Sequence, residues 1–135
     1  MADQQKAIKY ANVPRFALVK SRYTDKSAND LTTAVVDYLN LSGFFATRLA
    51  STGTFRADLQ KYVPSRQRSG LPDVMAVVDG RSVFIEVKVG KDRLSEEQRE
   101  AINDLENAGA SVFVAGDFQG FYDWFQKEFQ TAPFA

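Results

Sequence analysis

Two carboxylates and a lysine lie close together in the stretch from Ser69 to Lys88, SGLPDVMAVVDGRSVFIEVK. Asp73 begins one predicted strand, and Glu86 and Lys88 lie near the end of the next. Side chains alternate between the two faces of a strand, so Glu86 and Lys88 share a face. If the strands pair as a hairpin through Asp79-Gly80, Asp73 can lie beside Glu86. Two carboxylates would suit a magnesium ion, and the lysine could orient a water molecule or stabilise charge on a phosphate.

The composition limits which metals such a site could use. The chain has 135 residues, with no Cys and no His. Disulfides and thiolate zinc sites are therefore excluded, and the commonest general base and nitrogen ligand are missing. Oxygen ligands remain, which favours Mg²⁺ or Mn²⁺ over zinc. The length suits one domain, and no apolar run reaches membrane-spanning length. Without a recognisable targeting signal, we expect no membrane association and a cytoplasmic location.

The net charge of zero conceals an asymmetry along the chain. Residues 44–93, which include the candidate site, hold 9 basic and 5 acidic side chains, whereas residues 94–135 hold 2 basic and 8 acidic ones. A nucleic-acid surface needs a local basic patch rather than a basic protein. The charge distribution alone is explained at least as well by an ordinary solvated surface.

The hydrophobic pattern predicts the elements that would position these residues. Residues 28–42 show an apolar stripe at helical spacing, with Asn29 or Asp30 as the N-cap and Gly43 as the stop signal. Residues 44–49 follow as a strand and lead into a long polar stretch, which we interpret as a loop.

The second half of the chain continues the alternation of helices and strands. A capping-box pattern at Ser95 begins a helix, residues 111–116 form a short strand, and residues 118–129 form a last helix. The aromatic stripe of that helix predicts core packing, with a dimer interface as the second interpretation. The resulting order, αβββαβ plus a final helix, predicts an α/β fold with a mixed sheet flanked by helices.

The paired motifs resemble those of a known superfamily. Pro72-Asp73 and Glu86-Val87-Lys88 match the PD and (D/E)xK motifs of PD-(D/E)XK nucleases. The match extends to a wider run and is similar to the VRR-NUC and Holliday-junction-resolvase-like branch, over roughly residues 28–116. That run consists of Gly70 to Val74, Phe84 to Lys88, and then Leu94, Ser95 and Gln98. The resemblance implies a restriction-endonuclease-like core in a single domain of residues 28–135, preceded by an N-terminal arm of residues 1–27.

The resemblance also implies an activity. We expect a metal-dependent endonuclease that hydrolyses phosphodiester bonds in DNA. Branched DNA and single-stranded DNA are among the candidate substrates. Asp73, Glu86 and the backbone carbonyl of Val87 would bind Mg²⁺ or Mn²⁺. Lys88 would orient the attacking water or contact the scissile phosphate, and Gln98 would lie close to the active site. Resolvase-like relatives often act as dimers, which makes a homodimer plausible.

Two of the implied residues have ordinary structural explanations. Related nucleases usually carry a further acid, often Glu, on the helix before the first strand, but this chain has no Glu before Glu86. Asp30 is the candidate for that metal ligand, and an N-cap role is equally expected for it. Gln98 stands three residues after Ser95, a spacing that a capping box alone explains.

Basic residues around the candidate site could contact a phosphate backbone. Residues 50–69 interleave them with aromatic side chains, a composition that suits phosphates and unstacked bases, although a flexible insertion would look the same. The turn after Lys88 is also basic. The candidate phosphate contacts are Arg48, Arg56, Lys61, Arg66, Arg68, Lys91 and Arg93.

Two other functions compete with the nuclease. The missing upstream Glu favours a catalytically inactive module that retains the nuclease fold and binds nucleic acid. The third possibility is a small α/β domain in which the ExK residues form an ordinary surface ion pair. The position of the PD motif and the helix that follows ExK favour the nuclease.

Overall fold

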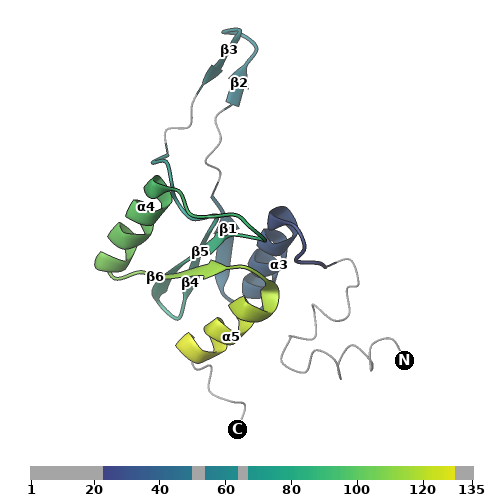
Figure 1. Ribbon diagram of the computed structural model, residues 1–135, viewed down its shortest axis with the longest axis vertical. Helices are drawn as coiled ribbons and strands as arrows, with labels where there is room; N and C mark the ends of the chain where they lie inside the picture. The colour runs from purple at the N-terminus through teal and green to yellow at the C-terminus, as the bar shows by residue number, and fades with distance from the viewer. Residues whose placement is uncertain (1–22, 50–53, 64–66, 130–135) are drawn as a thin grey trace.

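The computed structural model describes residues 23–49, 54–63 and 67–129 (Figure 1). The predicted arm therefore lies mostly outside the described residues. The helices are α3 (Ala28–Leu41), α4 (Glu96–Asn107) and α5 (Phe118–Phe129). The strands are β1 (Phe45–Arg48), β2 (Thr54–Arg56), β3 (Lys61–Val63), β4 (Val74–Val78), β5 (Arg81–Val87) and β6 (Ser111–Ala115).

Four of these strands form the central sheet, in the order β1-β4-β5-β6. The first three pair antiparallel, whereas β6 runs parallel to β5 after the crossover through α4. This is the predicted mixed α/β sheet. The predicted hairpin is also confirmed, because Val78 pairs with Arg81 across a tight turn. Asp79 and Gly80 both have positive φ, as the favoured two-residue hairpin turn requires.

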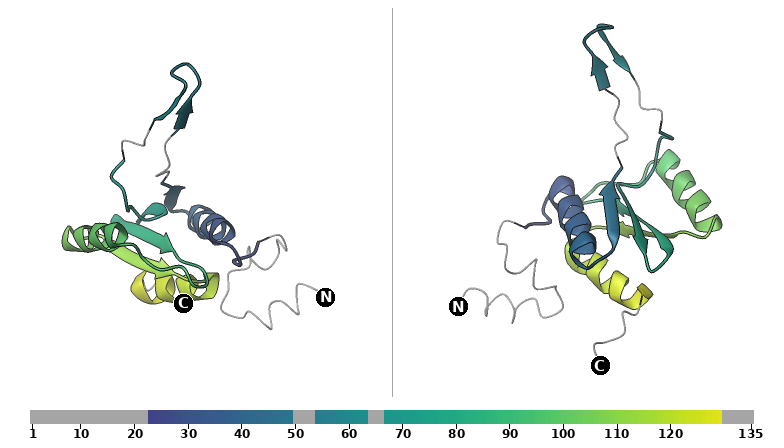
Figure 2. Two further views of the ribbon diagram at one scale, coloured as in Figure 1. Left: turned by 45° about the horizontal axis from the view of Figure 1, so that its top comes forward. Right: turned by 180° about the vertical axis from the view of Figure 1, so that it is seen from behind.

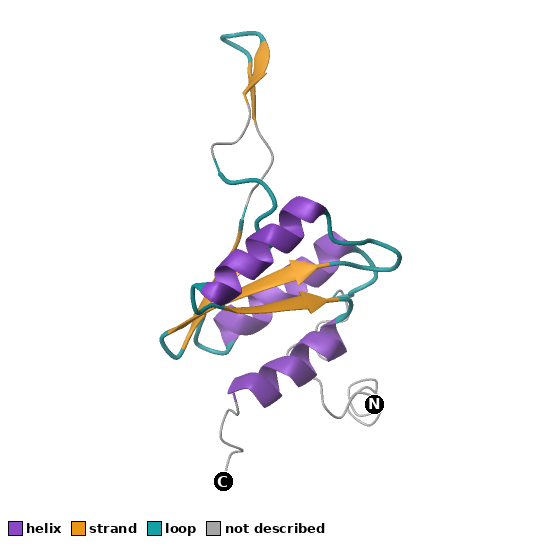
Figure 3. Cartoon of the chain, turned by 60° about the vertical axis from the view of Figure 1, so that its left-hand side comes forward, coloured by secondary structure: helices purple, strands orange, loops and turns teal. Residues whose placement is uncertain are grey.

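The core lies between one face of the sheet and the helices α3 and α5, while α4 lies on the other face (Figure 3). Leu31 and Val35 of α3 belong to the same hydrophobic cluster as Phe121 and Phe125 of α5, and all four side chains are fully buried. Burying one such side chain contributes roughly 1.5–3 kcal/mol. The aromatic stripe of α5 is therefore core, as its first interpretation predicted.

The start of α3 differs from the prediction. Ser27 is the N-cap, and its hydroxyl accepts a hydrogen bond from the backbone N–H of Asp30 at 3.1 Å. The proposed caps Asn29 and Asp30 are wrong because both already lie inside the helix, whereas Ser27 has the extended backbone of a cap. The helix ends at Leu41, one residue before the predicted end. Gly43, whose φ is +94°, follows as the expected stop signal.

Residues just before α3 are tied to the domain. The hydroxyl of Tyr23 donates a hydrogen bond to Asp37 of α3. The backbone N–H of Phe118, the first residue of α5, donates to a carboxylate oxygen of Asp25 at 2.9 Å. The last residues of the predicted arm thus help to join the two helices that cover the core.

The long loop predicted for residues 50–69 is wrong in its centre, which is a hairpin. β2 and β3 pair antiparallel, with Arg56 opposite Lys61. They contact no other described helix or strand, and the hairpin stands away from the sheet in every view (Figure 2). At its root, the N–H of Leu49 donates to the carbonyl of Asp73 at 2.8 Å, which closes the insertion between β1 and β4.

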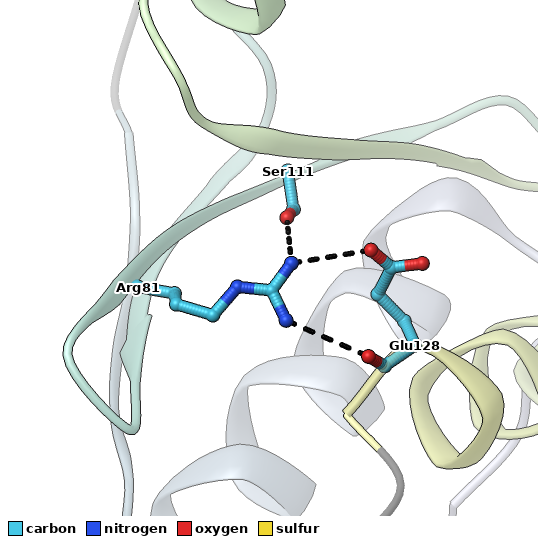
Figure 4. A network of polar contacts seen from close by, with 3 residues as sticks. All are labelled: Arg81, Ser111 and Glu128. Atoms are coloured by element: carbon cyan, nitrogen blue, oxygen red, sulfur yellow. Dashed lines mark hydrogen bonds and ion pairs between the residues drawn. The ribbon is translucent and has the colours of Figure 1, made fainter.

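A polar network holds the sheet end farthest from Asp73 (Figure 4). The Arg81 guanidinium donates to Ser111 of β6 at 2.8 Å and to the carboxylate of Glu128 at 3.2 Å. It also reaches the Glu128 carbonyl at 3.5 Å and lies 4.4 Å from the centroid of the Phe129 ring. A cation at the C-terminal end of a helix is favourable, so Arg81 ties α5 to both strands.

Candidate active site

Asp73 is held by the strands on both of its sides. Its carbonyl accepts from Leu49 after β1, and its carboxylate oxygen Oδ2 accepts from the backbone N–H of Val87 at 2.7 Å. Because Val74 pairs with Ile85, continuing the register sets Asp73 beside Glu86. The segment leading into β4 thus places a carboxylate at the end of β5, where the PD and ExK motifs meet.

Glu86 lies on the sheet face that carries α4, with only 1% of its surface exposed. Its Oε1 is 3.5 Å from the side-chain nitrogen of Gln98, a weak hydrogen bond. Its Oε2 is buried and has no hydrogen-bond partner among the described residues. A carboxylate oxygen buried without a donor is costly, so this atom is available to a ligand.

The pKa of Glu86 reflects this environment. Burial, as the largest cause, together with hydrogen bonding and repulsion from Asp73, raises the pKa to about 8, while Lys88 acts in the opposite direction. A proton on Glu86 gives the pair a donor that two ionised carboxylates lack. In the metal-free protein Glu86 therefore favours its protonated form at neutral pH.

Gln98 forms the capping box with Ser95 and also contacts Glu86 of the candidate site. In the capping box of α4, the side-chain Oε1 of Gln98 accepts a hydrogen bond from the backbone N–H of Ser95 at 2.9 Å. The backbone N–H of Gln98 donates to the Ser95 hydroxyl at 3.1 Å. The capping bond fixes the amide oxygen, so the amide nitrogen turns toward Glu86. The start of α4 is thereby coupled to the buried carboxylate.

Gly70 lets the segment before Asp73 pass close to α4. Its φ is +83°, and a Cβ at this position would lie 2.5 Å from the carbonyl oxygen of Glu97 and 3.0 Å from the nitrogen of Gln98. In the sequence, Gly70 is recognisable only as part of the run that contains the PD motif. Its spacing before Pro72-Asp73 carried no sign of a close backbone approach, which depends on where α4 packs.

Lys88 follows β5 and is half-buried. Its backbone N–H donates to the carbonyl of Ala115 at 2.9 Å, which extends the pairing with β6 by one residue. The alternation of the strand therefore continues and sets Lys88 on the same face as Glu86. Lys91 and Arg93 are exposed in the loop that leads from here to α4.

The structure shows that several candidate phosphate contacts already have protein partners. Arg48 donates to the Asn29 carbonyl at 2.9 Å and to the Thr33 hydroxyl at 2.6 Å. Arg56 pairs with Asp58 through two bonds, and Arg68 pairs with Asp104 of α4 at 2.7 Å. Lys61 is exposed, and Arg66 lies outside the described residues.

The structure does not bring a third acid to Asp73 and Glu86. Within residues 23–49, 54–63 and 67–129, no three His, Cys, Asp or Glu side chains are grouped so that they could hold a metal ion. The contacts of Arg48 place the first turn of α3 at the same sheet end as Asp73, but Asp30 is not grouped with the two carboxylates. Metal binding here would rely on those two carboxylates and on groups other than acids.

A mixed sheet with a PD segment entering one central strand and ExK ending the next is the arrangement of PD-(D/E)XK-like nuclease domains. The sequence matches the VRR-NUC domain family over residues 38–117. The chain belongs to this family of nuclease domains. No curated protein matches the chain. No helix among the described residues is long and apolar enough to cross a membrane.

Proposed function

We propose that the chain is a metal-dependent nuclease that hydrolyses phosphodiester bonds in DNA. The observation that supports this most is the buried, unpartnered Oε2 of Glu86 beside the Asp73 carboxylate. Buried charges in proteins are paired or coordinate metals. A buried glutamate that favours its proton beside Asp73 has a clear use if a divalent cation takes the place of that proton.

The register of the sheet supports Val87 as a third oxygen ligand. Continued past Val74 and Ile85, the β4–β5 pairing sets Pro72 opposite Val87. The N–H of Val87 points toward Asp73, and a strand residue presents its N–H and C=O on the same side. Proline has no N–H, so Pro72 cannot donate to the Val87 carbonyl. Asp73, Glu86 and this carbonyl form an oxygen donor set suited to Mg²⁺ or Mn²⁺.

The remaining residues have roles that follow from their positions. A bound Mg²⁺ or Mn²⁺ supplies Lewis-acid stabilisation of phosphate charge and lowers the pKa of a coordinated water. Lys88, on the face of Glu86, orients the water or contacts the scissile phosphate. Gln98 holds the Glu86 carboxylate in place. Lys91 and Arg93 contact neighbouring phosphates without reading the base sequence.

The second candidate is an inactive member of the same fold that only binds nucleic acid. It is favoured by one observation, the absence of a third acid beside Asp73 and Glu86 among the described residues. Such a module would bind DNA equally well with and without a metal ion, whereas the nuclease needs the ion for cleavage.

A cleavage assay separates the two functions. Purified protein is incubated with plasmid, single-stranded and four-way-junction DNA, in Mg²⁺, in Mn²⁺ or in EDTA. The test variant is Asp73→Asn, which keeps an acceptor for the Val87 N–H. The matched control is Asp79→Asn, in the turn that joins β4 to β5 at the far end of their hairpin.

We expect metal-dependent cleavage by the wild type and by Asp79→Asn, and a loss of at least about 100-fold in Asp73→Asn, comparable to the removal of a central catalytic group. Full cleavage by Asp73→Asn would contradict the assigned site. DNA binding without cleavage under any condition would favour the binding module.

A further inference from the structure

The hairpin formed by β2 and β3 has its root beside the candidate site, but its strands do not pack against any other described helix or strand. Its two ends leave the sheet at Leu49 and Asp73, which are joined by a backbone hydrogen bond. Beyond this root, the hairpin contacts no other described helix or strand. A two-stranded hairpin alone is only marginally stable in water, so it gains most from a partner that covers it.

The surface of the hairpin indicates the chemistry of that partner. Lys61 is exposed and makes no ion pair with a described residue, because Asp58, the acid between the two strands, is paired with Arg56. Next to it, Tyr62 has 58% of its surface exposed. An available ammonium beside an exposed aromatic ring suits a phosphate backbone and the base or sugar next to it.

Helix α4, which lies beside the site, carries mostly negative charge. Five acidic side chains and one arginine are exposed along α4, and Arg68 is already paired with one of those acids. A polyanion held at the candidate site is therefore repelled from the exposed face of α4, whereas Lys61 of the hairpin offers it an available cation. The exposed acids of α4 are Glu96, Glu97, Glu100, Asp104 and Glu106.

We propose that the hairpin is a nucleic-acid-binding arm that contacts duplex DNA at a distance from the bond to be cleaved. This inference rests on the proposed function, because it takes DNA as the occupant of the site. The chain between Leu49 and Leu59 of the hairpin turn can span at most about 34 Å. At a rise of about 3.4 Å per base pair, the arm contacts DNA up to about ten base pairs away.

A binding assay in EDTA tests the arm without requiring cleavage. Fluorescence anisotropy compares a duplex of about 8 base pairs, closed by a loop and shorter than the reach of the arm, with one of about 30 base pairs. The full chain is used as wild type, as the Lys61→Ala/Tyr62→Ala variant and as a matched control, Phe45→Ala/Lys127→Ala. Phe45 is an aromatic residue with the same 58% exposure, on β1.

We expect the Lys61→Ala/Tyr62→Ala variant to lose at least about tenfold in affinity for the long duplex, with a salt dependence reduced by about one phosphate contact. The loss on the short duplex should be much smaller, and the control should match the wild type on both. Equal losses on the two duplexes, or a loss no larger than the control's, would overturn the proposal.

Two further outcomes separate this proposal from its alternatives. If the variant binds DNA normally but sedimentation shows a changed oligomeric state, the arm binds protein, and the proposal is wrong. If Asp73→Asn cleaves nothing yet shows the wild-type dependence on duplex length, the arm is supported independently of catalysis. A wild-type protein that binds neither duplex would overturn both the arm and the proposed function.

Discussion

The raised pKa of Glu86 predicts that the metal-free protein becomes less stable as the pH rises from 6 to 8. In the folded chain this pKa is about 8, against an ordinary value of 4.5. Below pH 4.5 the folded and the unfolded chain both hold this proton, so Glu86 does not make the free energy of unfolding vary with pH. Between 4.5 and 8 the folded state keeps a proton that the unfolded chain has released, so stability falls with rising pH.

The magnitude follows from the same pKa. One proton corresponds to about 1.4 kcal/mol per pH unit, which gives an upper limit of about 2 kcal/mol between pH 6 and pH 8 once the titration of Glu86 near pH 8 is included. For a domain of this size, a loss of 1–2 kcal/mol lowers the Tm by about 4–8 °C. The window is favourable for measurement because the chain contains no His, whose titration would otherwise dominate it.

The assay is thermal unfolding by circular dichroism in EDTA at pH 6, 7 and 8, with wild type beside Glu86→Gln. The glutamine cannot titrate, so its Tm should vary much less with pH. Added Mg²⁺ should stabilise the wild type more at pH 8 than at pH 6, because a bound cation replaces the proton. A wild-type Tm that is constant or rises from pH 6 to 8, or a Glu86→Gln Tm that falls equally, would refute the reasoning.

Three further predictions test other parts of the structure. Lys88→Ala should reduce cleavage at least about 100-fold while DNA affinity stays within a few-fold; filter binding beside the cleavage assay checks this, and comparable losses would contradict the assigned role. Gly70→Ala should destabilise the protein by about 1–3 kcal/mol, since its Cβ would meet the backbone of α4, and an unchanged Tm would disprove this close approach. Arg81→Ala should lower stability by about 0.5–1.5 kcal/mol, measured by urea unfolding, because it loses the contacts to Ser111 and Glu128. The Arg81→Ala variant should cleave like the wild type, and a loss of cleavage as large as that of Lys88→Ala would show that the far end of the sheet affects the site.

Local patterns were sufficient to predict the main elements and the pairing of the two motifs. The turn at Asp79-Gly80 and the alternation of faces at Glu86 depend on neighbouring residues, and both are confirmed, because Val87 packs in the core while Glu86 contacts Gln98 of α4. The cap of α3 was misassigned by a few residues because Ser27, Asn29 and Asp30 all favour that position. Only the backbone conformation distinguishes them.

Features with a weak local signal, or features that depend on distant contacts, could not be predicted. The strands of the projecting hairpin are only three residues long, and their turn contains Gln60 at φ +52° rather than a glycine. The pairing of Arg68 with Asp104 joins residues 36 positions apart. The double use of Gln98 was missed because the sequence presented its two functions as alternatives, whereas one amide has separate atoms for each.

Because of the backbone hydrogen bond between Leu49 and Asp73, the positions of the two carboxylates do not depend on the length of the insertion between β1 and β4. Both ends of the intervening chain are fixed by one backbone hydrogen bond at the sheet. The entropic cost of closing such a loop grows by only about 0.6 kcal/mol when its length doubles. An insertion rooted in this way can be lengthened, shortened or exchanged while Asp73 and Glu86 stay in register. The domain therefore has a natural grafting point, where a new segment could be attached to an unchanged core.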